Sequence, residues 1–314
     1  MENLLKETNF KNFGEKKTGK VRDVYIQKDR IILISTDRHS SFDRIIAHIS
    51  HKGQVLNQIS AFWFEKTKDI IPNHVIEVPD PNATVAKKCK PLPIEIVPRG
   101  YITGVTGTSL WTHYQEGQRD FGNFVLPDGM KKNQKLDKPV LTFTTKSDVH
   151  DRQVTPKEIL AEGLVEEKVW NKVAEKSMEL FARGQEIAAK SGLILVDTKY
   201  EFGIGEAGEL ILIDEIHTPD SSRYWQIATY DERMTADKEP EFFDKEFLRL
   251  WFKENCDPYK DAVLPPAPAE LVEELSRRYI QIFEQITGAH FEVPALDTDI
   301  AERIKNNLKK YYVA

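Results

Sequence analysis

The chain has 314 residues, 40% of them hydrophobic and 30% charged, and its formal net charge is −6. Such a composition is typical of a globular protein that can bury a sizeable core. The acidic balance argues against a nucleic-acid binder, since any phosphate site would have to be a local basic cluster. No apolar run approaches the roughly 20 residues that span a bilayer, so we expect no membrane partner. Cys89 and Cys256 are too few for a disulfide framework, and we expect a cytoplasmic location.

The first third of the chain predicts strands and one helix. Residues 21–26 and 30–36 are rich in β-branched and aromatic side chains and flank a short polar turn, which is the pattern of a β-hairpin. After Gly53, apolar residues recur every three or four positions and predict a helix. Short strands are expected at residues 74–78 and 92–98.

The rest of the chain mixes further strands with helices. Thr155 precedes a helix, because a proline follows it and a glutamate stands three positions later, as in a capping box. The remaining strands are expected at residues 139–146, 192–204 and 210–216. The remaining helices are expected at residues 109–114, as two helical segments between 156 and about 190, at 241–255, and as a final pair before the end of the chain. This order predicts an α+β fold with antiparallel or mixed sheets rather than a doubly wound fold.

The stretch LVDTKYEFG, residues 195–203, carries a charge at every second position of an otherwise apolar run. Side chains alternate across a strand, so Asp197, Lys199 and Glu201 are expected to share one face. A half-exposed strand with a solvated side would show the same pattern. The segments around it decide between these interpretations.

The second strand of this hairpin contributes another carboxylate. If the turn is centred on residues 207–208, Glu201 lies opposite Asp214, with Cβ atoms about 5 Å apart. Two like charges in direct opposition destabilise a sheet unless a cation compensates them, and carboxylates that meet nucleotide phosphates suit Mg²⁺. The alternative is a register shifted by one residue, which would leave one carboxylate in solvent. The sequence alone leaves both registers open.

Basic residues in turn-rich segments are candidates for anion binding. Gly19 and Lys20 precede the first strand, but their spacing is not that of a Walker loop, and a Gly-Lys pair is also common in plain turns. Arg99 stands among glycines and hydroxyl residues in PRGYITGVTGTSLW, a composition suited to a phosphate monoester. Arg223 in HTPDSSRYW offers a planar fork for phosphate or carboxylate, although a lone loop arginine is usually only solvated.

Two polar loops follow the ends of strands, where functional residues are often found. STDRHSSFDR contains Ser41 and Asp43, and its alternative interpretation is a capped turn that enters a helix. TTKSDVHD contains Lys146, His150 and Asp151. His150 is a candidate base, but a histidine in an acidic turn is more often only hydrogen-bonded. No Ser–His–Asp, Cys–His or zinc-binding pattern is present in the sequence.

Six segments, in order and at matching spacing, make the chain resemble the phosphoribosylaminoimidazole-succinocarboxamide synthase (SAICAR synthetase) family. The similarity runs from about residue 10 to about residue 255, and the length is similar to that of the family's longer, fungal-like form. The segments are GKVRDVY, STDRHSSFD, LPIEIVPRGYITG, TTKSDVHD, LVDTKYEFG and DEIHTPDSSRYW.

The resemblance implies a two-lobed, ATP-grasp-like fold with C-terminal helices. It implies a ligase of purine biosynthesis that joins carboxyaminoimidazole ribotide (CAIR) to L-aspartate while ATP becomes ADP and phosphate. The CAIR carboxylate would be activated as an acyl phosphate, which the aspartate amine then attacks. The implied cofactors are ATP and Mg²⁺. The implied partners are these small molecules, and the protein itself is expected to be a monomer or a homodimer.

The resemblance also assigns roles to residues of this chain. The nucleotide and its cation would contact Gly19, Lys20, Arg22, Glu95, Val97, Lys146, Glu201 and Asp214, the last two as the metal pair and residues 95–97 as the adenine hinge. The reacting groups would lie near Lys20, Asp197, Lys199 and Glu201. The other substrates would contact Ser41, Asp43, Arg99, Ser109, Asp151 and Arg223. The stretch GVTGTS departs from the family pattern, so either Thr108 or Ser109 would reach the phosphate, and we favour Ser109.

Three parts of the chain are expected to form distinct units. They are an N-terminal nucleotide-binding lobe (1–110), a catalytic lobe with the magnesium hairpin (111–255), and a helical extension packed on the core (256–314). One alternative function is that of a small-molecule kinase or another ATP-dependent carboxylate–amine ligase. A second is that of a nucleotide-binding regulatory module without catalysis.

Overall fold

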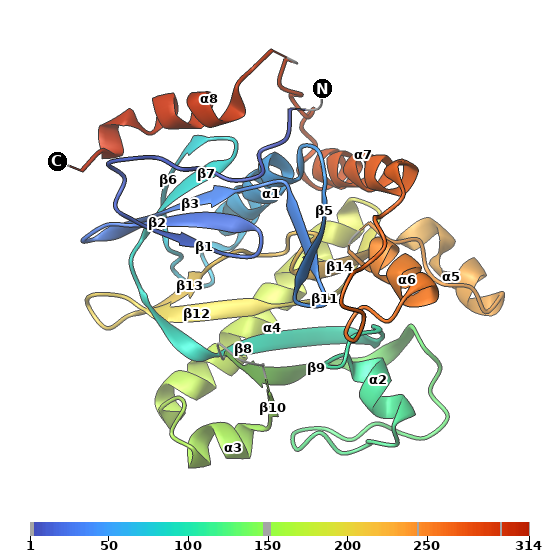
Figure 1. The fold of residues 1–314 in the computed structure, drawn as a ribbon. Helices are drawn as coiled ribbons and strands as arrows, with labels where there is room; N and C mark the ends of the chain where they lie inside the picture. Colours follow the sequence, from blue (N-terminus) through green and yellow to red (C-terminus); the bar gives the residue numbers. More distant parts are fainter. Residues whose placement is uncertain (1–2, 147–151, 244, 296, 314) are drawn as a thin grey trace.

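The computed structural model describes residues 3–146, 152–243, 245–295 and 297–313. These residues form two large β-sheets, a small hairpin and eight α-helices (Figure 1). Neighbouring strands pair antiparallel in both large sheets, so the expected α+β class is confirmed. No helix in the described part of the chain is both long and apolar enough to cross a membrane.

A five-stranded sheet forms one half of the molecule. Its strands, in spatial order, are β1 (Glu15–Thr18), β2 (Arg22–Ile26), β3 (Arg30–Ser35), β7 (Ala83–Lys87) and β6 (Val75–Asp80). The expected first hairpin is the β2–β3 pair, in which Arg22 faces Ser35. Ile32 and Ile34 of β3 are fully buried, as β-branched residues on the inner face of a sheet should be.

A separate hairpin of β4 (Arg38–Ser41) and β5 (Arg44–His48) follows this sheet. Its turn residues Phe42 and Asp43 have φ angles of 55° and 59°, the left-handed conformation that a two-residue hairpin turn requires. The alternative of a capped turn that enters a helix is therefore wrong for this stretch. Helix α1 (Lys52–Thr67) begins only after the second strand.

A seven-stranded sheet forms the other half. Five of its strands follow one another in the spatial order β10 (Gln153–Val154), β9 (Gln134–Thr145), β8 (Lys90–Ile102), β11 (Leu193–Thr198) and β14 (Ser222–Gln226). The other two strands are β12 (Tyr200–Ile204), which pairs with β8, and β13 (Leu210–Ile213), which pairs with β12. The long strand β8 therefore touches β9, β11 and β12.

The expected single strand at residues 192–204 is wrong in one respect, because it is interrupted at Lys199. β11 pairs with β14, whereas β12 pairs with β13, so the chain changes partners between them. At the break the backbone N–H of Lys199 donates to the carbonyl of Ser221 at 3.0 Å. The interruption brings the loop that contains Ser221 beside the charged face of this strand.

Helices cover the outer faces of the sheets. The expected capping box opens α3 (Pro156–Ala161), where Thr155 and Glu158 exchange hydrogen bonds. Helix α4 (Glu167–Lys190) packs against β11 and β8. The shorter helices are α2 (Leu110–Gln115), α5 (Ile227–Thr235), which the sequence analysis missed, and α6 (Glu246–Asn255).

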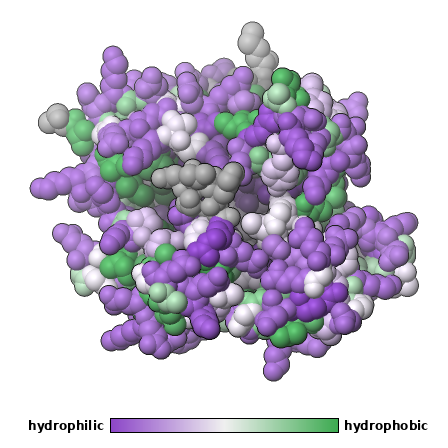
Figure 2. Space-filling view, turned by 60° about the horizontal axis from the view of Figure 1, so that its bottom comes forward, coloured by the Kyte–Doolittle hydropathy of each residue, from purple (hydrophilic) through white to green (hydrophobic). Residues whose placement is uncertain are grey.

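The C-terminal helices contact both halves of the molecule. Helix α7 (Ala269–Thr287) lies beside α1 and contributes buried side chains to the main core (Figure 1). Helix α8 (Ile300–Asn307) and the 3₁₀ turn η1 (Lys309–Tyr311) pack over the five-stranded sheet in a second core. The face shown in Figure 2 is mostly hydrophilic, with apolar side chains only in small patches.

Candidate active site

Two adjoining cavities contain the predicted site residues. The smaller, of about 250 Å³, lies over β8, β11 and β14, and the larger, of about 520 Å³, extends to the five-stranded sheet and the β4–β5 hairpin. Every predicted site residue within the described part of the chain lines one of them. Asp151, with its neighbours Asp148 and His150, lies outside the described residues. The two cavities share one wall, formed by Lys199, Asp220, Ser221, Lys245 and Arg249.

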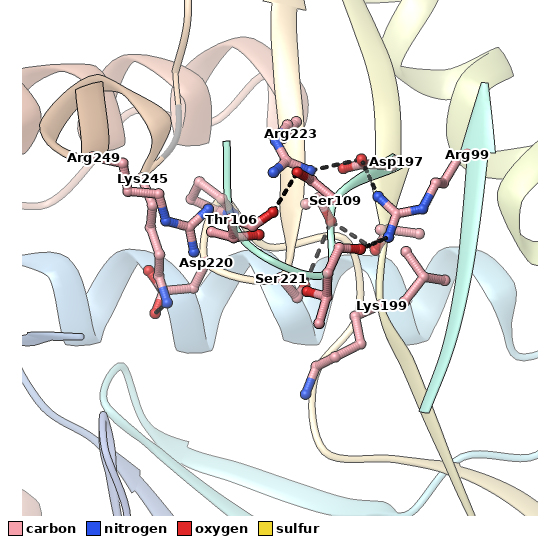
Figure 3. Close-up of a pocket in the computed structure, with 15 residues that line it drawn as sticks. Arg99, Thr106, Ser109, Asp197, Lys199, Asp220, Ser221, Arg223, Lys245 and Arg249 are labelled. Carbon is pink, nitrogen blue, oxygen red and sulfur yellow. Dashed lines mark hydrogen bonds and ion pairs between the residues drawn. The ribbon is translucent and has the colours of Figure 1, made fainter. Parts of the chain in front are cut away.

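Three charged side chains form a row across the floor of the smaller cavity (Figure 3). Asp197 of β11 faces Arg99 of β8 on one side and Arg223 of β14 on the other. Its Oδ2 accepts from Arg223 at 2.7 Å and from Arg99 at 3.2 Å. All three side chains are largely buried. Arg223 also lies 3.5 Å from the buried carboxylate of Glu246, which Arg249 contacts at 3.3 Å, so three guanidinium groups face two carboxylates. The row carries a net positive charge and is suited to an anion.

Burial opposes the positive charge of Arg99 in this row. It lowers the pKa of the Arg99 guanidinium to about 10, with Asp197 acting against that shift and Arg223 adding to it. A buried cation this poorly compensated is stabilised by any anion that enters the cavity. The smaller cavity therefore favours a phosphate or a carboxylate.

The loop before α2 closes the smaller cavity. Gly104 has a φ of 101°, and a Cβ there would lie 2.4 Å from the Ser109 Cβ and 2.8 Å from an Arg223 nitrogen, so only glycine fits. The Thr108 carbonyl accepts from Arg99 at 3.2 Å. The Ser109 hydroxyl donates to the Thr106 carbonyl at 2.6 Å. Thr108 and Ser109 both line the cavity, so the preference for Ser109 stays a prediction.

Lysines and glutamates alternate on the floor of the larger cavity. Lys199 donates to Glu95 at 2.7 Å and to Glu201 at 2.9 Å, and Lys146 pairs with the other oxygen of Glu201. Although burial opposes ionisation of Glu201, the ammonium groups of Lys199 and Lys146 hold the pKa of its carboxyl well below the usual value. Burial likewise opposes the charge of Lys199, but Glu201 and Glu95 raise the pKa of its ammonium far above normal. Both groups are therefore charged at neutral pH.

The predicted opposition of Glu201 and Asp214 is wrong. Glu201 pairs with Ile213 across the hairpin, one residue away from the expected register. The shift arises because the turn spans Gly205 to Gly208, where the Gly208 N–H donates to the Gly205 carbonyl at 3.0 Å. The carboxylate that directly faces Glu201 is Glu95 of β8, and Lys199 compensates this pair of like charges.

Asp214 nevertheless reaches the same cavity as Glu201. It follows the last residue of β13 with a φ of 70°, and its carboxylate binds Arg22 at 2.9 Å. Burial opposes the charge on Arg22, but Asp214 and Glu215 raise the pKa of its guanidinium above the usual value. Within the described residues, no cluster of three or more His, Cys, Asp or Glu side chains is arranged to hold a metal ion. Glu201 and Asp214 thus form a two-carboxylate site at most.

The glycine loop and the β4–β5 hairpin meet at the mouth of the larger cavity. Gly19 and Lys20 lie between β1 and β2, and the Lys20 ammonium contacts the Asp43 carboxylate at 2.5 Å. Both side chains are well exposed, so this pair contributes little to stability and is free to rearrange around a ligand. Ser41 lies beside Asp43 in the same wall.

The shared wall contains the residues that the sequence analysis missed. Lys245 and Arg249 lie one turn apart at the start of α6, and Figure 3 shows them across the cavity from Arg99 and Asp197. Their spacing of four residues in a predicted helix is a signal that would have placed them on one face. Asp220 belongs to the segment HTPDSSRYW, in which the sequence pattern assigns a role only to Arg223. Val97, predicted to contact the nucleotide, lines the smaller cavity instead.

Comparisons with known proteins agree on one family. The family model of SAICAR synthetase matches residues 15–266. A phosphoribosylaminoimidazole-succinocarboxamide synthase of Legionella pneumophila is 54% identical over 299 residues, which cover 95% of this chain and 96% of the relative. A chloroplastic one of Arabidopsis thaliana is 51% identical over 311 residues, 98% of this chain and 76% of the relative. The structure of a SAICAR synthase from Saccharomyces cerevisiae in complex with SAICAR is 30% identical, with a TM-score of 0.77, and covers 92% of this chain and 100% of that one.

Proposed function

The chain belongs to the SAICAR synthetase family, and on that basis we propose how its two cavities divide the substrates. The protein is an ATP-dependent ligase of de novo purine biosynthesis, with the ATP-grasp-like fold of that family. It joins the carboxylate of CAIR to the amine of L-aspartate, giving SAICAR, ADP and phosphate. All the substrates are anions, which explains why lysines and arginines converge in an acidic chain.

CAIR binds in the smaller cavity, with its phosphate on the Arg99–Asp197–Arg223 row. The observation that supports this most directly is the excess of cations: the guanidinium groups of Arg99, Arg223 and Arg249 face only two carboxylates, those of Asp197 and Glu246. A phosphate monoester would supply the missing negative charge and accept from the planar forks of Arg99 and Arg223. The yeast relative was solved with SAICAR, the product that retains this ribotide. Asp197 then orients both arginines and keeps them from repelling each other.

ATP binds in the larger cavity, with its phosphates toward Lys20 and Lys146. A glycine at position 19 lets the backbone approach a phosphate closely. Glu201 and Asp214 would hold Mg²⁺, because that ion commonly takes one or two protein carboxylates and completes its shell with phosphates and water. A two-carboxylate site facing a cavity fits that donor set. When bound, the ion would neutralise charge that develops on the transferred phosphoryl group.

The reaction takes place at the shared wall, where the two cavities meet. The CAIR carboxylate takes the γ-phosphoryl group of ATP, which gives an acyl phosphate and ADP. The aspartate amine then attacks the acyl carbon, the bond to the phosphate oxygen breaks, and the amine loses a proton. Lys199 lines both cavities, so its ammonium stays beside the carboxylate as negative charge accumulates. Its bonds to Glu95 and Glu201 fix that position.

L-Aspartate binds against Lys245 and Arg249. Neither the CAIR phosphate nor ATP is placed against these two cations of the shared wall, so they are available for the third substrate. A dicarboxylate placed there faces positive charge and presents its amine to the junction of the two cavities. Asp220 and Ser221 complete the same wall.

Several expectations stay predictions. They are the lobes at 1–110, 111–255 and 256–314, the adenine hinge at residues 95–97, the contacts of Ser41, Asp43 and Asp151 with substrate, the cytoplasmic location, and the monomer or homodimer. The Glu95 side chain belongs to the Lys199 ion network, so a hinge role there would use the backbone.

The decisive experiment measures ADP release with ATP, magnesium and CAIR, with and without L-aspartate. We expect appreciable ADP release only with aspartate present, and SAICAR in equal amount. ADP release that is independent of aspartate would indicate a kinase or an uncoupled ATPase. ATP binding without any turnover would indicate a regulatory module.

A further inference from the structure

Asp220 is the centre of a buried polar cluster under the shared wall. Its Oδ2 accepts from the Lys52 ammonium at 2.9 Å and from the Lys245 ammonium at 2.9 Å. Its Oδ1 accepts from the Tyr279 hydroxyl at 3.0 Å. Lys52 and Tyr279 are fully buried, and neither lines the cavities. Asp220 and Lys245 both line the two cavities, and they connect the buried part of the cluster to the proposed substrate side.

The charges in this cluster depend on one another. Although burial opposes ionisation of Asp220, Lys245 and Lys52 hold the pKa of its carboxyl far below the usual value. Burial lowers the pKa of the Lys245 ammonium to about 8, with Asp220 opposing the shift and Lys52 and Arg249 adding to it. The position of the Asp220 carboxylate therefore affects both where Lys245 points and how much charge it carries.

Helix α7 holds the three segments that meet in this cluster. Besides the Tyr279 bond to Asp220, the Ser276 hydroxyl donates to the Ser50 carbonyl at 2.7 Å, two residues before Lys52. Arg278 donates to the Phe242 carbonyl at 2.7 Å, three residues before Lys245. The three helix residues lie within about one turn of α7. All of them lie beyond residue 266, where the match to the family model ends. The C-terminal extension thus contacts Asp220, a residue of the cavity wall, from the buried side of that wall.

We propose that Tyr279 is a positioning residue for the ligation: through Asp220 it directs the Lys245 ammonium onto a carboxylate of L-aspartate. The inference rests on the proposed function, which places L-aspartate against Lys245 and Arg249. The geometry favours it because both lysines bind Oδ2 and the tyrosine binds Oδ1. Without the hydroxyl, the carboxylate can rotate and exchange its oxygens, and Lys245 moves with it.

The test compares Tyr279→Phe with Tyr311→Phe. Tyr311 is a matched control, because it is also a buried tyrosine of the C-terminal extension, and its hydroxyl binds Glu77 at the five-stranded sheet instead of the cavities. We expect Tyr279→Phe to raise the KM for L-aspartate about tenfold, the scale of one lost hydrogen bond to a buried charge. The KM values for ATP and CAIR should stay within about twofold. Tyr311→Phe should leave all three unchanged.

A double-mutant cycle separates positioning from a general loss of stability. If Tyr279 acts through Lys245, then Tyr279→Phe adds nothing further to the KM for aspartate in a Lys245→Gln background. Additive effects, or a KM for aspartate that Tyr279→Phe leaves unchanged, would overturn the inference. Equal rises in all three KM values with a lowered Tm would also overturn it, since they indicate only a loosened fold.

Two further results keep the test decisive. If Tyr279→Phe does not fold, Ser276→Ala loosens the same helix at Ser50, and it is expected to raise the KM for aspartate selectively. An unchanged KM in a folded Ser276→Ala variant would then refute the inference. If the wild-type protein itself releases no ADP in the presence of aspartate, the proposed function fails, and that failure is seen before any variant is compared.

Discussion

Replacing Glu201 with glutamine tests the assignment of the larger cavity most directly. The change keeps the size of the side chain and removes one negative charge. Glu201 is 6% exposed and binds Lys199 at 2.9 Å and Lys146 through its other oxygen. We expect the variant to fold and to lose at least about 100-fold in kcat, because the site would lose one of its two cation-binding carboxylates.

The cost in stability follows from the neighbours of Glu201. Removing one partner of a buried ion pair typically costs about 3–5 kcal/mol when the other charge is left uncompensated. Lys199 keeps Glu95 at 2.7 Å, and the Lys146 side chain is 44% exposed and can turn to water. We therefore expect a loss of only about 1–2 kcal/mol, or a few degrees in Tm.

The pH dependence of that loss has a defined sign. The pKa of Glu201 is depressed in the folded protein, so its ion pairs stabilise the fold fully above the unfolded carboxyl value of about 4.3. The difference in stability between wild type and Glu201→Gln should shrink as the pH falls below that value. Denaturant titrations at neutral and acidic pH would measure it.

Coupled ADP-release kinetics and thermal unfolding, measured on the same preparations, make up the assay. The control is Glu206→Gln, which removes the same charge from an exposed position in the turn of the same hairpin. We expect near-wild-type rates from the control. If Glu201→Gln also turned over at a near-normal rate, the cation and nucleotide assignment of this cavity would be wrong.

Further predictions concern Arg223, Lys245 and His74. Arg223→Ala should raise the KM for CAIR about tenfold or more and leave that for ATP unchanged, and equal effects on both in steady-state kinetics would move Arg223 out of the ribotide site. Burial lowers the pKa of Lys245 to about 8, so the KM for L-aspartate should rise as the pH increases through 8, and a constant value from pH 7 to about 9.5 would contradict the assignment. Burial lowers the pKa of His74 to about 4, so the unfolded chain takes up its proton first, and the urea midpoint should fall as the pH drops from about 6.5 toward 4. An unchanged midpoint at pH 5 would refute that reasoning.

Local patterns in the sequence located several of the elements that carry the site, although the β4–β5 hairpin was not among them. The β2–β3 hairpin follows from β-branched residues around a polar turn, and the start of α3 follows from its Thr155 capping box. These features depend on neighbours a few residues apart, and intrinsic propensity and capping act over that range. Described residues of all six motif segments line the cavities, some from within strands, such as Arg99 of β8 and Asp197 of β11, and others from loops, such as Lys20.

The register of the β12–β13 hairpin and the break at Lys199 were decided by tertiary structure. A one-residue difference in the turn moved the partner of Glu201 from Asp214 to Ile213, and β8 then brought Glu95 opposite Glu201. Sequence alternation fixes which side chains share a face, but it does not fix which strand pairs with which.

The sequence by itself determined the family, the reaction, and which segments contribute charged side chains to the two cavities. Only the folded chain decided that Lys52, Asp220, Lys245 and Tyr279, up to 227 positions apart in the numbering, form one buried cluster. The energy of such a cluster comes from ion pairs and hydrogen bonds between segments that are distant in sequence. No local propensity encodes those contacts, so they become visible only when helix α7 packs beside α1.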